Sequence, residues 1–158
     1  MKPINLKKLV VAILIPEAVG FLSALLSGSM GDAYDKFKQP PLSPPAILFP
    51  IVWAILYGLM GIASYIVYEA TVRRPKEGQE ALVFYGLQLG ANFLWPIVFF
   101  RLEAYYFAFV LLLILIVLVL ITAIKFKKQS DVAFYLLIPY IAWLLFAAYL
   151  NLGVAILN

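Results

Sequence analysis

Residues 107–121 read FAFVLLLILIVLVLI, and the uncharged run that contains them extends from Ala104 to Ile124. About 20 consecutive apolar residues are enough for a helix to cross a hydrocarbon core of about 30 Å. We therefore expect a membrane-spanning helix here. Because the run is almost entirely Leu, Ile and Val, we also expect this helix to expose the most surface to lipid.

Four further apolar blocks of similar length accompany this central run, at residues 6–26, 46–70, 82–100 and 132–157. Backbone polar groups in lipid must be bonded within the protein, and the blocks show no alternation of the kind found in membrane strands. The predicted fold class is therefore all-α: an integral membrane protein built as a bundle of five transmembrane helices. We expect a single domain over residues 1–158.

The composition excludes several classes of protein. Of the 158 residues, 65% are apolar and only 13% are charged, too few charges to cover a water-facing surface, which excludes an ordinary soluble enzyme, a nucleic-acid module and a disordered tail. Histidine and cysteine are both absent, so imidazole bases, thiolate nucleophiles and the usual metal ligands are missing. We expect no metal site and no intrinsic cofactor. We expect the aromatic residues, at 16%, to supply the binding groups.

The basic residues predict an orientation in the membrane. Nine of the twelve fall on one side of the five spans and three on the other. The nine are Lys2, Lys7, Lys8, Arg73, Arg74, Lys76, Lys125, Lys127 and Lys128, and the three are Lys36, Lys38 and Arg101. The positive-inside rule then places the N-terminus in the cytoplasm and the C-terminus outside, in a bacterial or archaeal cell membrane. The net charge of +4 reflects this topology, so we expect the lipid bilayer as a partner and no nucleic acid.

One long connection, residues 27–45, lies on the predicted outer side. Its segment KQPPLSPP, residues 38–45, holds four prolines in six residues. Proline fixes φ and lacks an amide donor, which favours a stiff extended or turn segment. Two interpretations remain open: a spacer before the second span, or a lid over the outer mouth of the bundle.

Aromatic and amide side chains share helical faces in three spans. Gln88, Asn92 and Trp95 follow one face of the third span, and Trp53 with Tyr57 follows one face of the second. The fifth span has a similar stripe of Tyr140, Trp143, Ala147 and Asn151. An amide in hydrocarbon needs a partner, so these faces should turn inward. They predict either an aromatic pocket open to the outer side or hydrogen bonds that only join the helices.

Two other features allow alternative interpretations. Glu17 lies within the first span, where a carboxylate is either a neutral structural group or a proton relay. Gly86 and Gly90 form a G-x-x-x-G pattern on the third span, which permits close helix approach inside the bundle or at a homodimer interface. We favour the structural carboxyl and the dimer contact.

Several ordered motifs resemble the TspO/MBR family of translocator and tryptophan-rich sensory proteins. They are PPLSPP at residues 40–45, FPIVWAILYGLMG at 49–61, QLGANFLW at 88–95, PYIAW at 139–143 and YLN at 149–151. The resemblance extends from about Pro16 to Asn158. It implies a five-helix fold, often dimeric, whose ligand cavity is closed by the first loop.

The resemblance also implies a ligand and the residues that contact it. Family members bind tetrapyrroles such as protoporphyrin IX, a small hydrophobic ligand. The implied ligand-binding positions, together with Gln88 from the amide stripe, are Tyr34, Pro44, Phe49, Trp53, Tyr57, Asn92, Trp95, Trp143 and Ala147. Trp53 and Trp143 match the tryptophans that the family associates with light-dependent porphyrin degradation, and would be the catalytic pair if this chain is photochemically active.

Three functions follow as hypotheses. The first is a receptor or sensor that binds a tetrapyrrole, the second a light-dependent porphyrin-degrading enzyme, and the third a small-molecule or porphyrin transporter with Glu17 as its only coupling group. Ala33 and Leu42 stand where many family members have tryptophan, which weakens the photochemical hypothesis. No basic residue follows Tyr149, so the sterol-recognition pattern of the family is not supported.

Overall fold

The computed structural model describes residues 3–158, so Lys2, counted above among the basic residues, lies outside the described residues. The elements are α1 (Leu6–Ser27), α2 (Met30–Lys36), α3 (Leu48–Ala70), α4 (Pro75–Pro96), the π-helical turn η1 (Ile97–Arg101), α5 (Tyr105–Gln129) and α6 (Asp131–Leu157). Five helical segments are long and apolar enough to cross a membrane: α1, α3, α4 with η1, α5 and α6. No strand occurs within residues 3–158. The predicted all-α five-span bundle is confirmed.

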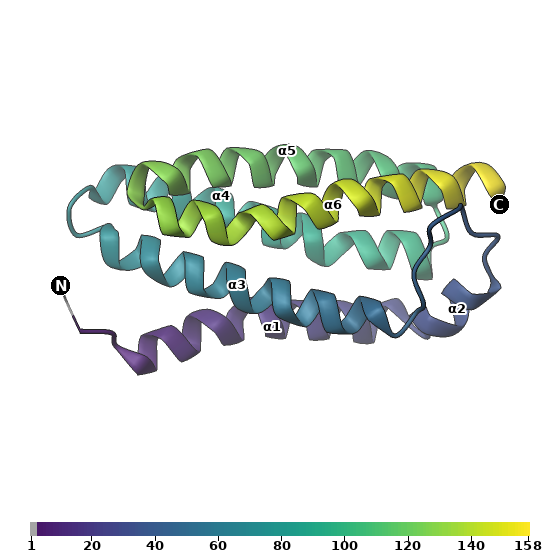
Figure 1. The fold of residues 1–158 in the computed structure, drawn as a ribbon, viewed down its shortest axis with the longest axis horizontal. Helices are drawn as coiled ribbons and strands as arrows, with labels where there is room; N and C mark the ends of the chain where they lie inside the picture. The colour runs from purple at the N-terminus through teal and green to yellow at the C-terminus, as the bar shows by residue number, and fades with distance from the viewer. Residues whose placement is uncertain (1–2) are drawn as a thin grey trace.

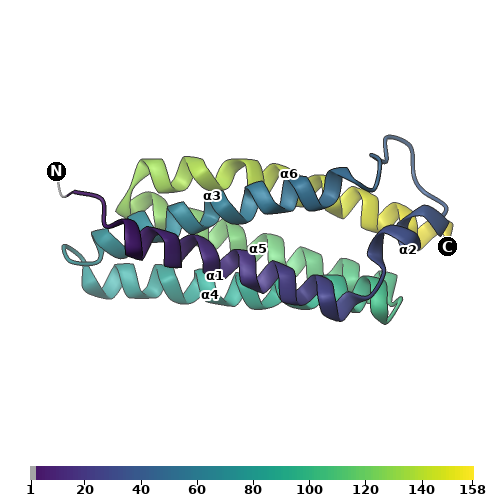
Figure 2. The same cartoon turned by 90° about the horizontal axis from the view of Figure 1, so that it is seen from below.

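The five long helices lie side by side along one axis (Figure 1). Going around the bundle, α1 packs on α3, α3 on α6, α6 on α5, α5 on α4, and α4 with η1 returns to α1. Turned by 90°, the bundle shows α1 lying over α3 and α4 (Figure 2). Helices α3 and α4 also touch across the middle, which brings the faces of the second, third and fifth spans together.

The two ends of the bundle differ in charge. The N-terminus and the α3–α4 and α5–α6 turns lie at one end, while α2, the long loop and the C-terminus lie at the other, which we call the loop end (Figure 1). At the N-terminal end, Lys125 Nζ lies 2.7 Å from Glu80 Oε1 and Lys8 Nζ lies 4.0 Å from Glu69 Oε1. The direction in which the bundle crosses the membrane stays a prediction.

Two helix boundaries differ clearly from the predicted ones, and the long loop contains an additional helix. Helix α4 begins at Pro75 rather than at residue 82, and α5 continues to Gln129 rather than ending at 124. Apolar runs mark only the part of a helix inside lipid, whereas these helices continue among charged residues. The loop 27–45 also contains α2, which the proline-rich composition did not indicate.

The expectation that the 104–124 run is the most lipid-exposed helix is wrong. In the most apolar window of each helix, 11% of α1 is buried against 33% of α5. Helix α5 packs on both α4 and α6, so its uniform apolar surface serves the core as well as the lipid. Lipid and protein interior favour the same side chains, so hydropathy alone does not separate them.

Helices α1 and α3 approach closely at Gly61. Pro16 lacks the amide that would bond the Ala12 carbonyl four residues back. That carbonyl oxygen lies 2.7 Å from the position that a Cβ on Gly61 would take, and Ile13 Cα lies 2.6 Å from it. Both are backbone atoms, so only a residue without a side chain fits there.

We predict that Gly61→Ala lowers the free energy of unfolding by roughly 1–3 kcal/mol, because the added methyl group forces two helix backbones apart. Gly58→Ala is the matched control: its Cβ would meet nothing nearer than Glu17 Oε2 at 3.8 Å. Thermal denaturation in detergent, followed by circular dichroism, measures both. Equal melting temperatures for the two variants would contradict the close contact.

Candidate functional site

Four buried polar side chains form a continuous hydrogen-bonded set, which we call the polar ladder: Tyr57, Asn92, Tyr140 and Gln88. Tyr57 Oη donates to Asn92 Oδ1 at 2.6 Å, and Asn92 Nδ2 donates to Tyr140 Oη at 2.7 Å. Tyr140 Oη in turn donates to Gln88 Oε1 at 2.7 Å. The ladder therefore joins α3, α4 and α6 in the middle of the bundle.

The ladder shows what the two amides bond within the protein. Asn92 uses both its oxygen and its nitrogen within the ladder, and Gln88 Nε2 has a weak contact with Met60 Sδ at 3.8 Å. Both amides therefore bond protein partners and join the helices, and their part in a ligand site stays a prediction. As ligand contacts they would use the amide hydrogens and lone pairs that these bonds leave over.

Two groups of aromatic rings lie between the ladder and the loop end. The first, which we call the loop cluster, consists of Tyr34, Phe49, Trp143 and Phe146. Its ring centroids are 4.9 Å apart from Tyr34 to Phe49, 5.7 Å from Phe49 to Trp143, and 5.6 Å from Trp143 to Phe146. The rings come from α2, α3 and α6, so the cluster joins the loop to the membrane-spanning part.

The second group is centred on Trp53. Its ring stacks on Tyr57 with centroids 5.5 Å apart and meets Tyr140 edge-on at 6.2 Å. Because both tyrosines belong to the polar ladder, the ladder also holds the indole of Trp53 in place. Ala147, another predicted site residue, is buried in the same apolar core.

Trp95 belongs to a different environment from the other two tryptophans. Its ring stacks on Phe99 at 5.1 Å, and its Nε1 donates to Asn151 Oδ1 at 2.9 Å. Asn151 Nδ2 donates in turn to the Tyr105 carbonyl at 2.9 Å. Trp95 thus helps to join α4, α5 and α6, and its aromatic contacts do not include the rings around Trp53 and Trp143.

Hydrogen bonds hold the long loop onto the end of α6. Asn158 Oδ1 accepts from the Lys38 amide at 3.1 Å, and its Nδ2 donates to the Lys38 carbonyl at 2.9 Å. Tyr149 Oη donates to the Pro41 carbonyl at 2.6 Å, and Tyr34 Oη donates to the Pro44 carbonyl at 2.5 Å. Burial raises the pKa of Tyr34 above its ordinary value, so its hydroxyl, already a donor at neutral pH, remains one under more alkaline conditions. These bonds join the loop to α6 and to Tyr34 of the loop cluster, and the lid interpretation stays a prediction.

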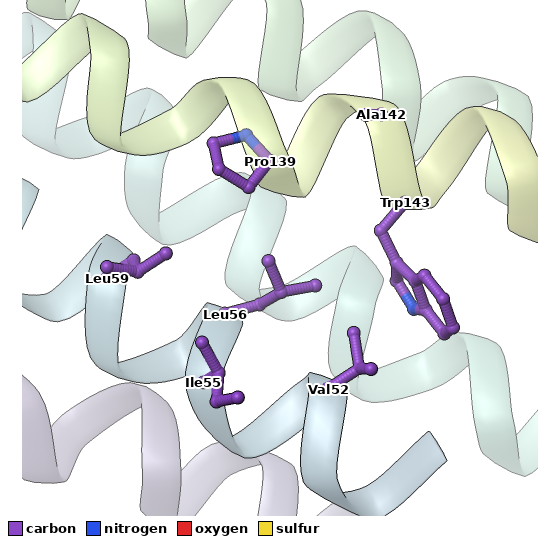
Figure 3. Close-up of a pocket in the computed structure, with 7 residues that line it drawn as sticks. All are labelled: Val52, Ile55, Leu56, Leu59, Pro139, Ala142 and Trp143. Carbon is purple, nitrogen blue, oxygen red and sulfur yellow. The ribbon is translucent and has the colours of Figure 1, made fainter. Parts of the chain in front are cut away.

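A groove of about 450 Å³ lies between α3 and α6 (Figure 3). Its lining residues are Val52, Ile55, Leu56, Leu59, Pro139, Ala142 and Trp143. Of the predicted ligand-binding residues, only Trp143 is among them. Ile55, Pro139 and Ala142 are exposed, so the groove opens to the side of the bundle and not to its end. The predicted pocket was expected to open outward.

Sequence reasoning missed the other six lining residues. The sequence pattern that contains them consists of two stripes of apolar residues, at i, i+3, i+4 and i+7 on α3 and at i and i+3 on α6. Apolar stripes of this kind are equally typical of core contacts, so the spacing alone does not indicate a groove.

The remaining candidate residues have simpler positions. Gly86 and Gly90 are exposed, and a Cβ on either would meet nothing within 4 Å, so they make no close contact inside the bundle. Glu17 lies in the seam between α1 and α3, beside Gly58. Within residues 3–158, no group of three side chains suited to hold a metal ion occurs.

We predict that Tyr140→Phe lowers the free energy of unfolding by roughly 1–3 kcal/mol, because it leaves Asn92 Nδ2 and Gln88 Oε1 without their partner in a buried site. Tyr135→Phe removes the same hydroxyl from a ring on α6 that is 64% exposed, and should cost much less. Unfolding in detergent compares the two variants. If the Tyr140→Phe protein were as stable against unfolding as the Tyr135→Phe control, the ladder would add no stability.

Comparison with known proteins agrees with this architecture. The sequence model of the TspO/MBR family matches residues 12–157. The chain is 36% identical over 139 residues to the translocator protein of Ovis aries, covering 87% of this chain and 82% of the ovine one. It is 35% identical over 155 residues to the tryptophan-rich protein TspO of Archaeoglobus fulgidus, covering 98% and 99% of the two chains. Protein CrtK of Rhodobacter capsulatus is 30% identical over 147 residues, covering 89% and 91%. Five membrane-spanning helices and a family match over nearly the whole chain make this protein a member of the TspO/MBR family.

Proposed function

We propose that this membrane protein is a receptor for a hydrophobic tetrapyrrole of the protoporphyrin IX type. The observation that carries the proposal is the gathering of aromatic rings from α3, α6 and the loop region beneath the proline-rich segment. A flat aromatic macrocycle binds well between such rings, because stacking and edge-on contacts act over a large area.

The proposed site is the loop cluster together with Trp53. The macrocycle would enter between Phe49 and Trp143, whose ring planes now meet at 61°, as the loop moves away. Lys36 and Lys38 are exposed at the same end and provide positive charge for the two propionates. Because the loop is joined to α6 by a few hydrogen bonds, its displacement costs less than opening the helical core.

We predict that Trp53→Phe combined with Trp143→Phe raises the dissociation constant for protoporphyrin IX about tenfold or more, since each lost ring contact is worth about 0.5–1.5 kcal/mol. The measurement is a titration of the protein in detergent, followed by the main absorbance band of the porphyrin. Trp95→Phe is the matched control and should keep most of the affinity, because its ring packs on Phe99.

Three outcomes separate the alternatives. Equal losses of porphyrin affinity in the double variant and in Trp95→Phe would contradict the proposed site. Saturable binding with an unchanged dissociation constant in both variants would mean that the ligand binds elsewhere. Under illumination, bleaching of the bound porphyrin faster than in empty micelles, and lost in the double variant, would instead support a light-dependent enzyme with Trp53 and Trp143 as its reactive residues.

We further propose that the protein forms a homodimer through the outward face of α4. Gly86 and Gly90 present bare backbone on this face, which lets a second helix approach closely. Val83 and Leu94 are exposed on the same side and would pack beside them.

We predict that Gly90→Leu lowers the dimeric fraction at least several-fold, because the side chain keeps the two helices apart. Ala54→Leu, which adds bulk to an exposed position on α3, serves as the control. Single-molecule photobleaching in liposomes counts the subunits in each particle. If both variants had the dimeric fraction of the unaltered protein, the α4 face would not be the interface.

A further inference from the structure

A small pocket with charged walls lies at the N-terminal end of the bundle, where the beginning of α4 packs beside the end of α5. Its volume is about 140 Å³, well below the roughly 300–1,000 Å³ of sites that enclose a drug-sized ligand. The pocket therefore suits a small polar group. Its lining residues are Glu77 and Glu80 from α4, and Lys125, Lys128 and Gln129 from α5.

The pocket lies at the level where the apolar parts of the two helices end. The apolar run of α5 ends at Ile124, directly before Lys125, and that of α4 begins at Leu82, two residues after Glu80. Both segments lie at the end of the bundle that holds the N-terminus (Figure 1). The headgroups of a bilayer lie immediately outside its hydrocarbon core. The pocket is therefore within reach of lipid headgroups.

Two of the four charges in the pocket neutralise each other. Lys125 Nζ lies 2.7 Å from Glu80 Oε1, which joins α5 to α4. The same nitrogen lies 5.2 Å from the centroid of the Phe84 ring, and the Lys125 side chain is only 24% exposed. The ring and the carboxylate together hold this lysine in place, so it forms a fixed wall of the pocket.

The other two charges remain available to a ligand. Glu77 is 57% exposed at its side chain, and Arg74 Nη1 lies 3.7 Å from its carboxylate, an exposed pair of the kind that contributes little. Lys128 is exposed and makes no ion pair within residues 3–158. Because α4 starts and α5 ends here, both residues lie one turn nearer the end of the bundle than the Glu80–Lys125 pair.

This arrangement favours a ligand that carries both signs of charge. An anion bound to Lys128 would also meet the carboxylate of Glu77 in the same small pocket, and a cation bound to Glu77 would meet the ammonium of Lys128. A zwitterion with a phosphate and a primary ammonium group satisfies both residues. The ammonium has three N–H donors for the carboxylate, and the phosphate oxygens accept from the lysine.

A row of apolar side chains leads from the pocket along α4 and α5. It continues the helical faces of Glu80 and Lys125, at spacings of three or four residues. Leu87 and Ile114 in this row are each 51% exposed, so the row remains open to lipid. An acyl chain below a bound headgroup would lie along it, whereas a soluble zwitterion would leave it unused. The row consists of Phe84 and Leu87 on α4 and of Ile114, Leu118 and Ile121 on α5.

We propose that this pocket binds an aminophospholipid of the phosphatidylethanolamine type. Its ammonium group donates to Glu77, its phosphate accepts from Lys128, and an acyl chain lies along the apolar row. The site lies at the end of the bundle opposite the proposed tetrapyrrole site, and the two share no residue.

The test counts lipids bound to the full chain by native mass spectrometry after its release from detergent micelles. Phosphatidylethanolamine, phosphatidylcholine and phosphatidylglycerol with the same acyl chains are compared at equal concentrations. We expect phosphatidylethanolamine to bind about fivefold or more tightly than phosphatidylcholine, whose trimethylated nitrogen has no N–H donor for Glu77. It should also bind more tightly than phosphatidylglycerol, which has no ammonium group. Free phosphoethanolamine, the headgroup without acyl chains, should bind much more weakly.

Variants with matched controls test the two contacts separately. Glu77→Gln should abolish the preference for phosphatidylethanolamine over phosphatidylcholine, while Glu69→Gln removes a carboxylate outside the pocket at the same end of the bundle and should keep it. Lys128→Gln should weaken the binding of phosphatidylethanolamine about fivefold or more. Lys127→Gln, next to it in the chain but not in the lining, should leave the binding unchanged.

Several results would overturn the proposal. They are equal binding of phosphatidylethanolamine and phosphatidylcholine, tighter binding of phosphatidylglycerol, a preference that survives Glu77→Gln, and binding that is unchanged in Lys128→Gln. Free phosphoethanolamine binding as tightly as the lipid would also do so, because a soluble zwitterion would then be the occupant. Porphyrin titration of Glu77→Gln tests the tetrapyrrole site separately, since Glu77 lies at the other end of the bundle.

Discussion

The structure depends on one constraint: inside a hydrocarbon layer, polar groups must find their partners within the protein. Each polar side chain of the ladder meets this requirement through a residue on another helix. Tyr57 on α3, Asn92 on α4 and Tyr140 on α6 bond one another, and Trp95 bonds Asn151 in the same way. Because lipid tails are as apolar as leucine, these bonds and close backbone contacts such as that at Gly61 decide which helices pair.

The same constraint distinguishes the surroundings of Trp53 from those of Trp143. The hydroxyls of the ladder are fully used, which fixes the tyrosine rings on which Trp53 packs and thus prepares one wall of the proposed tetrapyrrole site. Trp143 differs, because its ring is held by Phe49 and Phe146 while its N–H meets no acceptor within residues 3–158. The two tryptophans therefore have different surroundings: one packs on the tyrosines of the ladder, and the other joins α6 to the loop cluster.

Helical periodicity predicted correctly which residues share a face, but not what that face meets. Gln88, Asn92 and Trp95 do follow one side of the third span. Yet the first two bond the tyrosines of the ladder, and Trp95 bonds Asn151 near η1. Trp95, expected among the ligand-binding positions with Trp53 and Trp143, packs on Phe99, because a shared helical face does not say which neighbour each side chain on it meets.

Sequence alone determined the number of spans, the all-helical class and the chemistry that is excluded, since hydropathy and composition are sums along the chain. It also indicated the stiff loop, through its prolines. Tertiary structure decided the order of helices around the bundle, the attachment of the loop to Asn158, and the groove beside Ala142. These features depend on how each helix is rotated against its neighbours. That rotation is set by contacts between residues far apart in the chain, which no local pattern records.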